Sequence, residues 1–228
     1  MPFEFEARAS DSPFVDSIWR TVSGDVERFL SVAVAHWELV FMRRRGQTWV
    51  TLRGPETRVS WADCPDDAEF FGIQFKLGSF IPDHPLGSLV DRAFDLDVTS
   101  GPRFHLAGTS WDLPAYENAD LFLHRLEREE LLLDDSLVQA TLAGTATAVS
   151  PRTLQRHFLD ATGLSHRRIR QIERARHAAV LLKAGQPIGA VVHATGYADQ
   201  PHLTRALRRL IGQTPREIAH RSVDLSLA

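Results

Sequence analysis

The chain has 228 residues, which is enough for one large domain or two small ones, each with a hydrophobic core. Its hydrophobic share of 43% and charged share of 24% are those of an ordinary globular protein, and no apolar run approaches the ~18 residues that span a bilayer. A single cysteine, Cys64, excludes an intrachain disulfide and fits a reducing compartment. With no basic leader before an apolar stretch at the N-terminus, we expect a cytoplasmic protein that does not enter membranes.

The first half of the chain predicts strands. Residues 3–7 and 47–53 alternate between apolar and polar side chains with period two, and the pattern of residues 69–77 predicts another strand. Residues 29–42 are rich in β-branched and aromatic side chains, although the pattern breaks at residues 36–38. Residues 82–94 indicate a loop followed by a short helix. We therefore expect a small, β-rich, mostly antiparallel sheet domain over residues 1–116.

The hydrophobic period changes at Glu117. Leucines interspersed with Glu and Arg predict an amphipathic helix over residues 117–133, which would link two domains. Its apolar face, with Leu123 and Leu126, needs a partner, so we expect it to serve dimerisation or docking between domains. Residues 134–228 are helical in pattern. The expected fold class is therefore α+β, with a β-rich N-terminal domain followed by an all-α domain. We expect this second domain to fold, and to bind its partner, without the N-terminal domain.

Charge divides the chain in the same place. Residues 136–228 carry thirteen Lys and Arg against five Asp and Glu, a net charge of +8, whereas the rest of the chain carries −11. A basic terminal part on an acidic protein is the footprint of a module that binds a polyanion. Charge alone does not separate nucleic-acid binding from a solvated basic surface.

The basic part contains an internal repeat with a spacing of 49 residues and no gap. The matched pairs are Ser150 and Asp199, Leu154 and Leu203, Arg156 and Arg205, Phe158 and Leu207, Gly163 and Gly212, Ser165 and Thr214, Arg167 and Arg216, and Ile169 and Ile218. Each half thus predicts the same supersecondary unit.

The matched residues have the chemistry of helix ends. Ser150 and Asp199 are suited to cap the start of a helix, and Gly163 and Gly212 are suited to the left-handed residue that closes it. Residues 214–217 have the spacing of a capping box. Inside each helix the apolar residues recur with helical spacing and predict a buried face, made of Leu154 and Phe158 in the first and of Leu203, Ala206, Leu207 and Leu210 in the second.

The opposite face of each helix carries arginines. Arg152 and Arg156 share one face at i and i+4, and Arg205 and Arg208 share the other helix's exposed arc, with Arg209 at its edge. A single stripe of this kind is usually a solvated surface, but two copies at one spacing favour DNA recognition, because the arginine fork matches guanine. A long helix over residues 166–184, roughly 28 Å, would hold the two units about one DNA turn apart, ~34 Å.

These stretches resemble a known family. Residues 150–158 and 162–165 of the first unit, and residues 196–205 and 208–217 of the second, match the DNA-binding domain of the AraC/XylS transcription regulators, so the resemblance covers residues from about 137 to 219. It implies a double helix-turn-helix that binds double-stranded DNA. The positions that it carries over as DNA-binding are Arg152, Gln155, Arg156, Gln200, Pro201, His202, Arg205, Arg208 and Arg209.

The first unit departs from the family pattern. Ala148 stands where the family usually has a glycine in the turn before the first recognition helix. Gly144 instead falls within the preceding helix by this interpretation, where it would cost about 1 kcal/mol relative to alanine. In the second unit, Val192 replaces the usual small alanine of the first helix. We therefore expect both units to lose some rigidity, and the first unit more than the second.

The N-terminal part is less informative. Many members of the family carry a ligand-sensing or dimerising β-domain there, so the candidate partners beyond DNA are RNA polymerase, a small-molecule effector and a second copy of the chain. Five tryptophans, Trp19, Trp37, Trp49, Trp61 and Trp111, would line an apolar ligand pocket or fill a small core, and the core is the favoured interpretation.

Catalytic motifs are missing from the sequence. The histidines before residue 130, His36, His84, His105 and His124, form neither H-x-H nor H-E-x-x-H, and there is no G-x-S-x-G, P-loop or G-x-G-x-x-G. We predict no catalytic residue, no metal and no cofactor. Two alternatives stay open: an enzyme, of repair or metal-dependent type, with an appended DNA-binding module, and a regulator whose N-terminal domain binds only protein partners.

Overall fold

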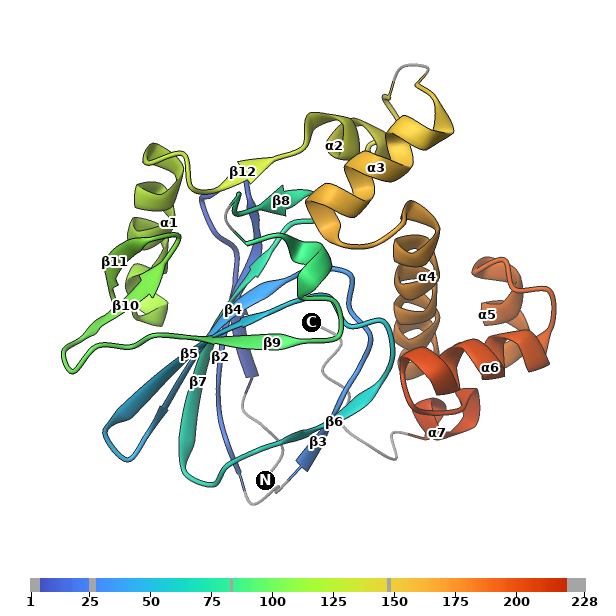
Figure 1. Ribbon diagram of the computed structural model, residues 1–228. Helices are drawn as coiled ribbons and strands as arrows, with labels where there is room; N and C mark the ends of the chain where they lie inside the picture. Colours follow the sequence, from blue (N-terminus) through green and yellow to red (C-terminus); the bar gives the residue numbers. More distant parts are fainter. Residues whose placement is uncertain (1–4, 25–27, 83, 147–148, 221–228) are drawn as a thin grey trace. The chain divides into compact units, whose positions relative to one another are not determined.

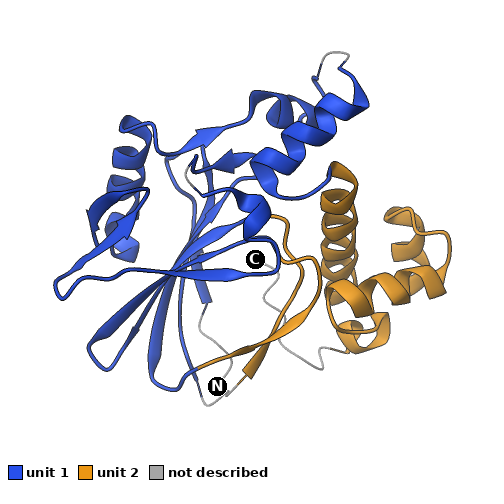
Figure 2. Ribbon diagram, viewed as in Figure 1, with its two compact units in different colours: residues 1–26, 36–55, 65–165 blue, residues 27–35, 56–64, 166–228 orange. Residues whose placement is uncertain are grey.

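The chain divides into two compact units, each described by itself (Figure 2). The computed structural model describes residues 5–24, 28–82, 84–146 and 149–220. Unit 1 comprises residues 1–26, 36–55 and 65–165, and unit 2 comprises residues 27–35, 56–64 and 166–228. Strands come first and helices follow along the chain, which confirms the expected α+β class (Figure 1).

Unit 1 is built on a six-stranded antiparallel sheet in the order β1-β2-β7-β4-β5-β9. Its strands are β1 (Phe5–Arg8), β2 (Val15–Val22), β4 (Glu38–Arg44), β5 (Gln47–Arg53), β7 (Ala68–Phe75) and β9 (Ala93–Leu96). Two smaller pairs accompany it: β10 (Arg103–Leu106) with β11 (Thr109–Asp112), and β8 (Ser79–Phe80) with β12 (Leu133–Asp134). The short 3-10 turns η1 (Leu86–Ser88) and η2 (Tyr116–Asn118) lie in its connections.

Several of these strands were predicted. β5 has the predicted limits, β7 covers most of residues 69–77, and β1 covers residues 5–8, whereas residues 3 and 4 of that prediction lie outside the described part. The run over residues 29–42 contains parts of two strands that belong to different sheets. The first is β3 (Arg28–Ser31), and the second, β4, begins at the end of the break in the pattern at residues 36–38.

The prediction for residues 82–94 was wrong at its end. The chain makes the single turn η1 and then forms β9, an edge strand paired with β5, where we expected a short helix. Leu96 is buried opposite Val50. Backbone pairing with the edge of the sheet outweighs the weak local preference of these residues for a helix.

One face of the sheet packs against the β10–β11 hairpin and the helix α1 (Ala119–Arg128) (Figure 1). Aromatic rings dominate this core: Phe41 stacks on Phe71 at 4.9 Å between centroids, and Phe104 contacts Phe41 edge-on at 5.6 Å. Of the five tryptophans, Trp37 and Trp111 belong to the core, whereas Trp61 is 61% exposed. The core interpretation therefore holds for two of the five.

The predicted linker helix is shorter and has a different role. α1 ends at Arg128 because Glu130 adopts a left-handed backbone, with φ of +55°, and the chain then pairs as β12 with β8. Leu123 and Leu126 are fully buried in the core of unit 1. Our expectation that this leucine face serves dimerisation or docking between domains is therefore wrong, since its own unit already covers it.

Unit 1 also contains the first two helices of the C-terminal part, α2 (Ser136–Leu142) and α3 (Pro151–Thr162). Gln139 donates a hydrogen bond to the Leu77 carbonyl oxygen at 2.7 Å, and α3 packs against η1. Val138 fills the space over Gly78, where a Cβ would lie 2.9 Å from its Cγ1. These helices are thus seated on the strand connections of their own unit.

The described residues of unit 2 form four helices and one strand pair. The helices are α4 (His166–Lys183), α5 (Ile188–Ala194), α6 (Gln200–Leu210) and α7 (Pro215–Ala219), and the strands are β3 (Arg28–Ser31) and β6 (Ser60–Asp63). α4 packs against the other three helices. Its buried side chains recur with helical spacing and are Ile169, Ile172, Ala175, Ala178, Ala179 and Leu182. No helix in the described ranges is long and apolar enough to cross a membrane.

Candidate nucleic-acid interface

The helix α3 begins and ends as predicted. Ser150 Oγ accepts a hydrogen bond from the Thr153 backbone N–H at 3.1 Å, and a proline occupies the first helical turn. At the other end, Gly163 adopts the left-handed conformation with φ of +72°. A Cβ at Gly163 would lie 2.7 Å from the Leu86 carbonyl oxygen, so the site requires glycine on two grounds.

The expectation for Gly144 was wrong. α2 ends at Leu142, and Gly144 follows the helix in a left-handed conformation with φ of +72°, so it terminates α2 rather than weakening it. Ala148, the other departure from the family pattern, lies outside the described residues.

A side-chain contact that the sequence did not predict joins α2 to α3. Asp135 caps α2, with Oδ1 accepting the Leu137 and Val138 backbone N–H groups at 2.9 and 3.0 Å. Its Oδ2 lies 2.6 Å from Nδ1 of His157 in α3. No motif links two residues that stand 22 positions apart, so no sequence signal was available for this contact.

The predicted DNA-facing residues of α3 are on its free side. Phe158 is fully buried and Leu154 is half-buried, whereas Arg152, Gln155 and Arg156 are exposed. The spacing i, i+3 and i+4 places these three side chains on one face. One face of α3 therefore offers two guanidinium groups and an amide to an outside partner.

The helix α6 repeats this construction in unit 2. Asp199 Oδ1 accepts the His202 backbone N–H at 2.7 Å, which confirms the predicted N-cap. Leu203, Leu207 and Leu210 are buried, as predicted. The predicted site residues on the other side are exposed: Gln200, Pro201, Arg205, Arg208 and Arg209.

His202 differs from the other predicted site residues because it is half-buried. Its ring contacts Tyr197 edge-on at 5.1 Å, and the guanidinium of Arg174 lies 4.3 Å from the centre of the same tyrosine ring. Burial raises the pKa of Tyr197, against the opposing charges of Arg174 and Arg209. This cluster packs α4 against the start of α6 and engages part of the His202 side chain, a role that the sequence did not indicate.

The helix α7 starts with the predicted capping box. Thr214 Oγ1 accepts the Glu217 backbone N–H at 3.3 Å, and the Glu217 carboxylate accepts the Thr214 backbone N–H at 2.6 Å. These hydrogen bonds, led by that from the Thr214 backbone, hold the pKa of Glu217 below its ordinary value.

α4 covers the residues predicted for the long connecting helix, His166–Lys183. α3 belongs to unit 1 and α6 to unit 2, so the one-turn separation of the two helices along DNA stays a prediction.

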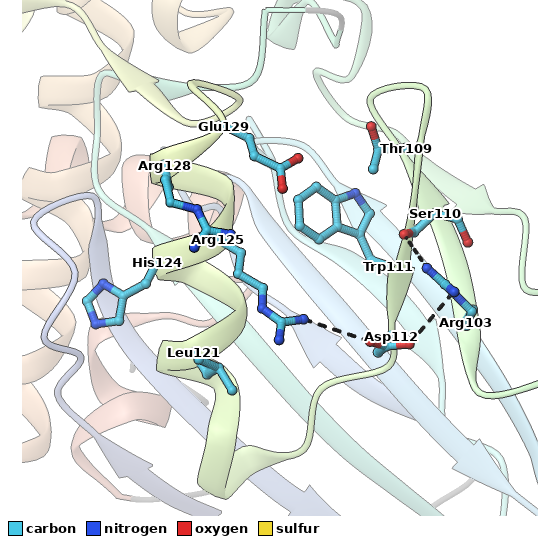
Figure 3. A pocket seen from close by; sticks show the side chains of 10 residues that line it. All are labelled: Arg103, Thr109, Ser110, Trp111, Asp112, Leu121, His124, Arg125, Arg128 and Glu129. Carbon is cyan, nitrogen blue, oxygen red and sulfur yellow. Dashed lines mark hydrogen bonds and ion pairs between the residues drawn. The ribbon is translucent and has the colours of Figure 1, made fainter.

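Two cavities of unit 1 are candidates for a small ligand. One, of about 510 Å³, lies between α1 and the β10–β11 hairpin (Figure 3). The other, of about 530 Å³, lies at one end of the sheet over Phe41, Phe71 and Tyr116. Within the described residues, no group of three or more His, Cys, Asp or Glu has a metal-binding arrangement.

Three arginines and two carboxylate residues are among the residues that line the first cavity. Arg103 and Arg125 approach the same carboxylate, Asp112, at 3.6 and 3.8 Å (Figure 3). Arg128 and Glu129 also line it. Trp111 donates its indole N–H to the Leu106 carbonyl oxygen at 3.1 Å, which fixes the ring at the wall of the cavity.

Comparison with known proteins agrees with the geometry of the C-terminal part. Residues 144–221 match a family model described as helix-turn-helix domain. The chain is 46% identical over 67 residues to the HTH-type transcriptional regulator RipA of Corynebacterium glutamicum, covering 29% of this chain and 20% of that protein. It is 33% identical over 106 residues to the HTH-type transcriptional regulator GlxA of Rhizobium meliloti, covering 46% of this chain and 32% of that protein.

The chain thus spans between a fifth and a third of the length of these relatives. No solved structure gives a significant match. The side-chain caps observed at the starts of α3, α6 and α7 all lie within the residues that the family model matches. Residues 144–221 therefore match the helix-turn-helix domain of AraC-type regulators.

Proposed function

We propose that the protein is a transcription regulator that binds a specific DNA sequence through α3 and α6. The observation that carries this proposal is the repeated construction of the two helices. Each is capped by a side chain, buries one apolar face and leaves an arginine face exposed, within a part of the chain whose net charge is +8.

The residues proposed to contact DNA differ in their tasks. Arg156 and Arg205 are on exposed faces one turn or so into their helices, where recognition helices of this class contact base edges. Arg152, Gln155, Gln200 and Pro201 lie in the same first turns, and His202 contributes with the part of its ring that Tyr197 does not cover. Arg208 and Arg209 are in the last turn of α6 and are assigned to phosphates.

Selection of duplexes tests this proposal directly. The full chain is used to enrich bound fragments from a random-sequence library, and its affinity for the selected duplex is compared with that for a scrambled duplex of the same composition. A specific regulator prefers its site by about 10³-fold or more. The double variant Arg156→Ala with Arg205→Ala should lose most of that preference.

An arginine outside the interface supplies the matched control. Arg92 is exposed in unit 1 and is not among the proposed contacts, so Arg92→Ala should keep the wild-type preference. Equal affinity of the wild-type chain for the selected and scrambled duplexes would refute specific recognition.

We propose further that unit 1 senses a small anion at the cavity between α1 and β10–β11. Three guanidinium groups, those of Arg103, Arg125 and Arg128, line it against the two carboxylates of Asp112 and Glu129, in a part of the chain whose net charge is −11. Guanidinium forks suit carboxylates and phosphates. The effector would therefore be a small carboxylate or phosphate ester.

Isothermal titration of the full chain with a panel of small carboxylates and phosphates tests this sensor site. Arg125→Ala with Arg128→Ala should abolish the heat of any binding that the wild type shows, while Arg92→Ala should not. Binding that survives in the double variant would exclude this cavity as the sensor site.

Regulation also requires an effect on RNA polymerase. We propose that the bound protein contacts the polymerase or blocks its access to the promoter, and that pairing of two copies on DNA extends the site. Transcription in a purified system with the selected duplex placed at a promoter gives the sign of regulation, and sedimentation of the complex gives the number of copies. These assignments concern the whole protein and rest on the DNA-binding proposal.

A further inference from the structure

Two segments of the N-terminal half belong to unit 2 and form a strand pair there. We call them the β3–β6 ribbon, which comprises residues 28–35 and 56–64. β3 and β6 pair antiparallel, with Arg28 bonded to Asp63 at 3.0 Å, and the backbones of Val34 and Glu56 continue the pair. In the chain, these segments are the connections from β2 to β4 and from β5 to β7 (Figure 2).

The ribbon donates hydrogen bonds to the C-terminal end of α6. The Val59 backbone N–H donates to the Arg209 carbonyl oxygen at 3.1 Å, and the Ala33 backbone N–H donates to the Leu210 carbonyl oxygen at 2.7 Å. The last four carbonyl groups of a helix have no partner within the helix. Two of those of α6 are therefore satisfied by residues that stand 150 and 177 positions earlier in the chain.

Side chains of the ribbon also fit the turn after α6. Gly212 has φ of +84°, and a Cβ there would lie 2.7 Å from Leu30 Cδ2 and 2.9 Å from Val59 Cγ2. Ala33, Leu210 and Ile211 are at most 1% exposed, so these contacts are fully excluded from water.

A second helix fixes the ribbon from another direction. Arg168 of α4 donates a hydrogen bond to the Thr57 carbonyl oxygen. The ribbon is thus bonded both to α6 and to the helix against which α6 packs.

We infer that the β3–β6 ribbon positions α6 for DNA, so that specific binding by the C-terminal half depends on residues 28–35 and 56–64 of the N-terminal half. The inference rests on the proposed function. The ribbon bonds to the C-terminal end of α6, whereas the N-terminal turn of α6, with Gln200 and Pro201, is exposed. A change in these two segments therefore alters the affinity for a specific site without any contact between the ribbon and DNA.

Full-length variants of the ribbon test the inference. Val59→Pro removes the N–H that bonds to α6, and Leu30→Ala removes the side chain over Gly212 and serves if the proline variant does not fold. Leu131→Ala is the matched control, because Leu131 is a partly buried leucine packed against the core of unit 1. Each variant is assayed below its melting temperature for affinity to the selected and scrambled duplexes and for hydrogen exchange of the α6 and α3 amides.

Val59→Pro should bind the selected duplex about fivefold more weakly, as loss of a hydrogen bond of ordinary strength implies. Leu30→Ala, which loses only the packing over Gly212, should weaken that binding in the same direction. Neither variant should change the affinity for the scrambled duplex by much. Their α6 amides should exchange faster while those of α3 do not. A merely structural role would lower the melting temperature and speed the exchange of α3 and α6 amides alike, without a selective loss of affinity for the selected duplex. The inference is overturned if folded ribbon variants keep wild-type affinity and exchange, or if Leu131→Ala weakens specific binding equally. A wild-type chain that does not distinguish the two duplexes refutes the proposed function instead, and the exchange measurement still decides the positioning of α6.

Discussion

The two arginines Arg205 and Arg209 are on the same helix, and we expect them to act through different interactions with DNA. Arg205→Ala should remove ~1–3 kcal/mol of discrimination between the selected and scrambled duplexes, because a bidentate contact to guanine is lost. Arg209→Ala should lower the affinity for both duplexes by the same factor. It should also reduce the slope of log K against log salt concentration by about 0.9, because one phosphate contact is lost. Affinities measured across a salt series separate the two effects.

Arg156→Ala provides a comparison in the first unit. We expect it to cost less specificity than Arg205→Ala, since the turn before α3 departs from the family pattern at Ala148. If Arg205→Ala keeps the wild-type ratio between the two duplexes, the proposal that Arg205 of α6 contacts base edges is wrong.

Asp120 at the start of α1 holds the N-terminal strand region in place. Its carboxylate bonds to Arg8 at 2.6 Å and accepts a hydrogen bond from the Ser10 hydroxyl. Burial by itself would raise the pKa of Asp120, but the hydrogen bonds from Ser10 and Arg8 and the charge of Arg8 outweigh it and lower the pKa below the ordinary 3.8. At neutral pH, Asp120→Asn should lower the free energy of unfolding by roughly 1–3 kcal/mol.

The pH dependence of this effect has a definite sign. A carboxyl whose pKa is lowered by folding stabilises the fold above its unfolded pKa, and this contribution is lost as the pH falls through the folded value. The difference between wild type and Asp120→Asn should therefore shrink below pH 3.8. Urea unfolding followed at neutral and at acidic pH checks this, and a difference that stays constant over the range would contradict it.

At the scale of elements, two glycines offer a matched test of helix termination. Gly144 and Gly163 both have φ of +72°, but a Cβ at Gly144 meets nothing within 4 Å, whereas one at Gly163 would lie 2.7 Å from a backbone oxygen. Gly144→Ala should cost about 1 kcal/mol for the left-handed backbone alone. Gly163→Ala should cost roughly 1–3 kcal/mol more because of the steric clash.

Thermal or urea unfolding of the two variants measures the difference. If both variants lower the free energy of unfolding by similar amounts, the backbone near Leu86 moves away from the added methyl group at little energetic cost.

The elements also show where local patterns suffice. The limits of β5 and α4 and the caps of α3, α6 and α7 follow from residues within a few positions of each other, so they were predictable. β9 and the shortened α1 depend on pairing with distant strands, and their local sequences do not contain that information.

At the scale of the molecule, the C-terminal part depends on the N-terminal part more than the sequence suggested. We expected residues 134–228 to fold and bind DNA alone, and the boundaries at residues 116 and 134 stay predictions. In the structure, α2 and α3 bond to or pack on Leu77, Gly78 and Leu86, and α6 bonds to the β3–β6 ribbon. A fragment cut at residue 134 lacks all of these partners.

We therefore expect the 134–228 fragment to unfold with low cooperativity and to exchange its α6 amides faster than the full chain does. Calorimetry and hydrogen exchange of the fragment beside the full chain make the comparison. Cooperative unfolding and undiminished affinity for the selected duplex would show instead that the helices form a self-sufficient domain.

The sequence by itself determined the helical construction of the proposed interface. Caps, terminating glycines and the apolar and arginine faces of α3 and α6 all arise from interactions between residues at most a few positions apart, so their signals are written in consecutive side chains. Only the tertiary structure decided that Leu123 and Leu126 belong to the core of unit 1, that His157 bonds to Asp135, and that the β3–β6 ribbon bonds to the end of α6. Backbone groups make the ribbon's hydrogen bonds, and every residue type except proline has the same N–H donor, so residue identities alone cannot reveal which distant segment satisfies a helix end.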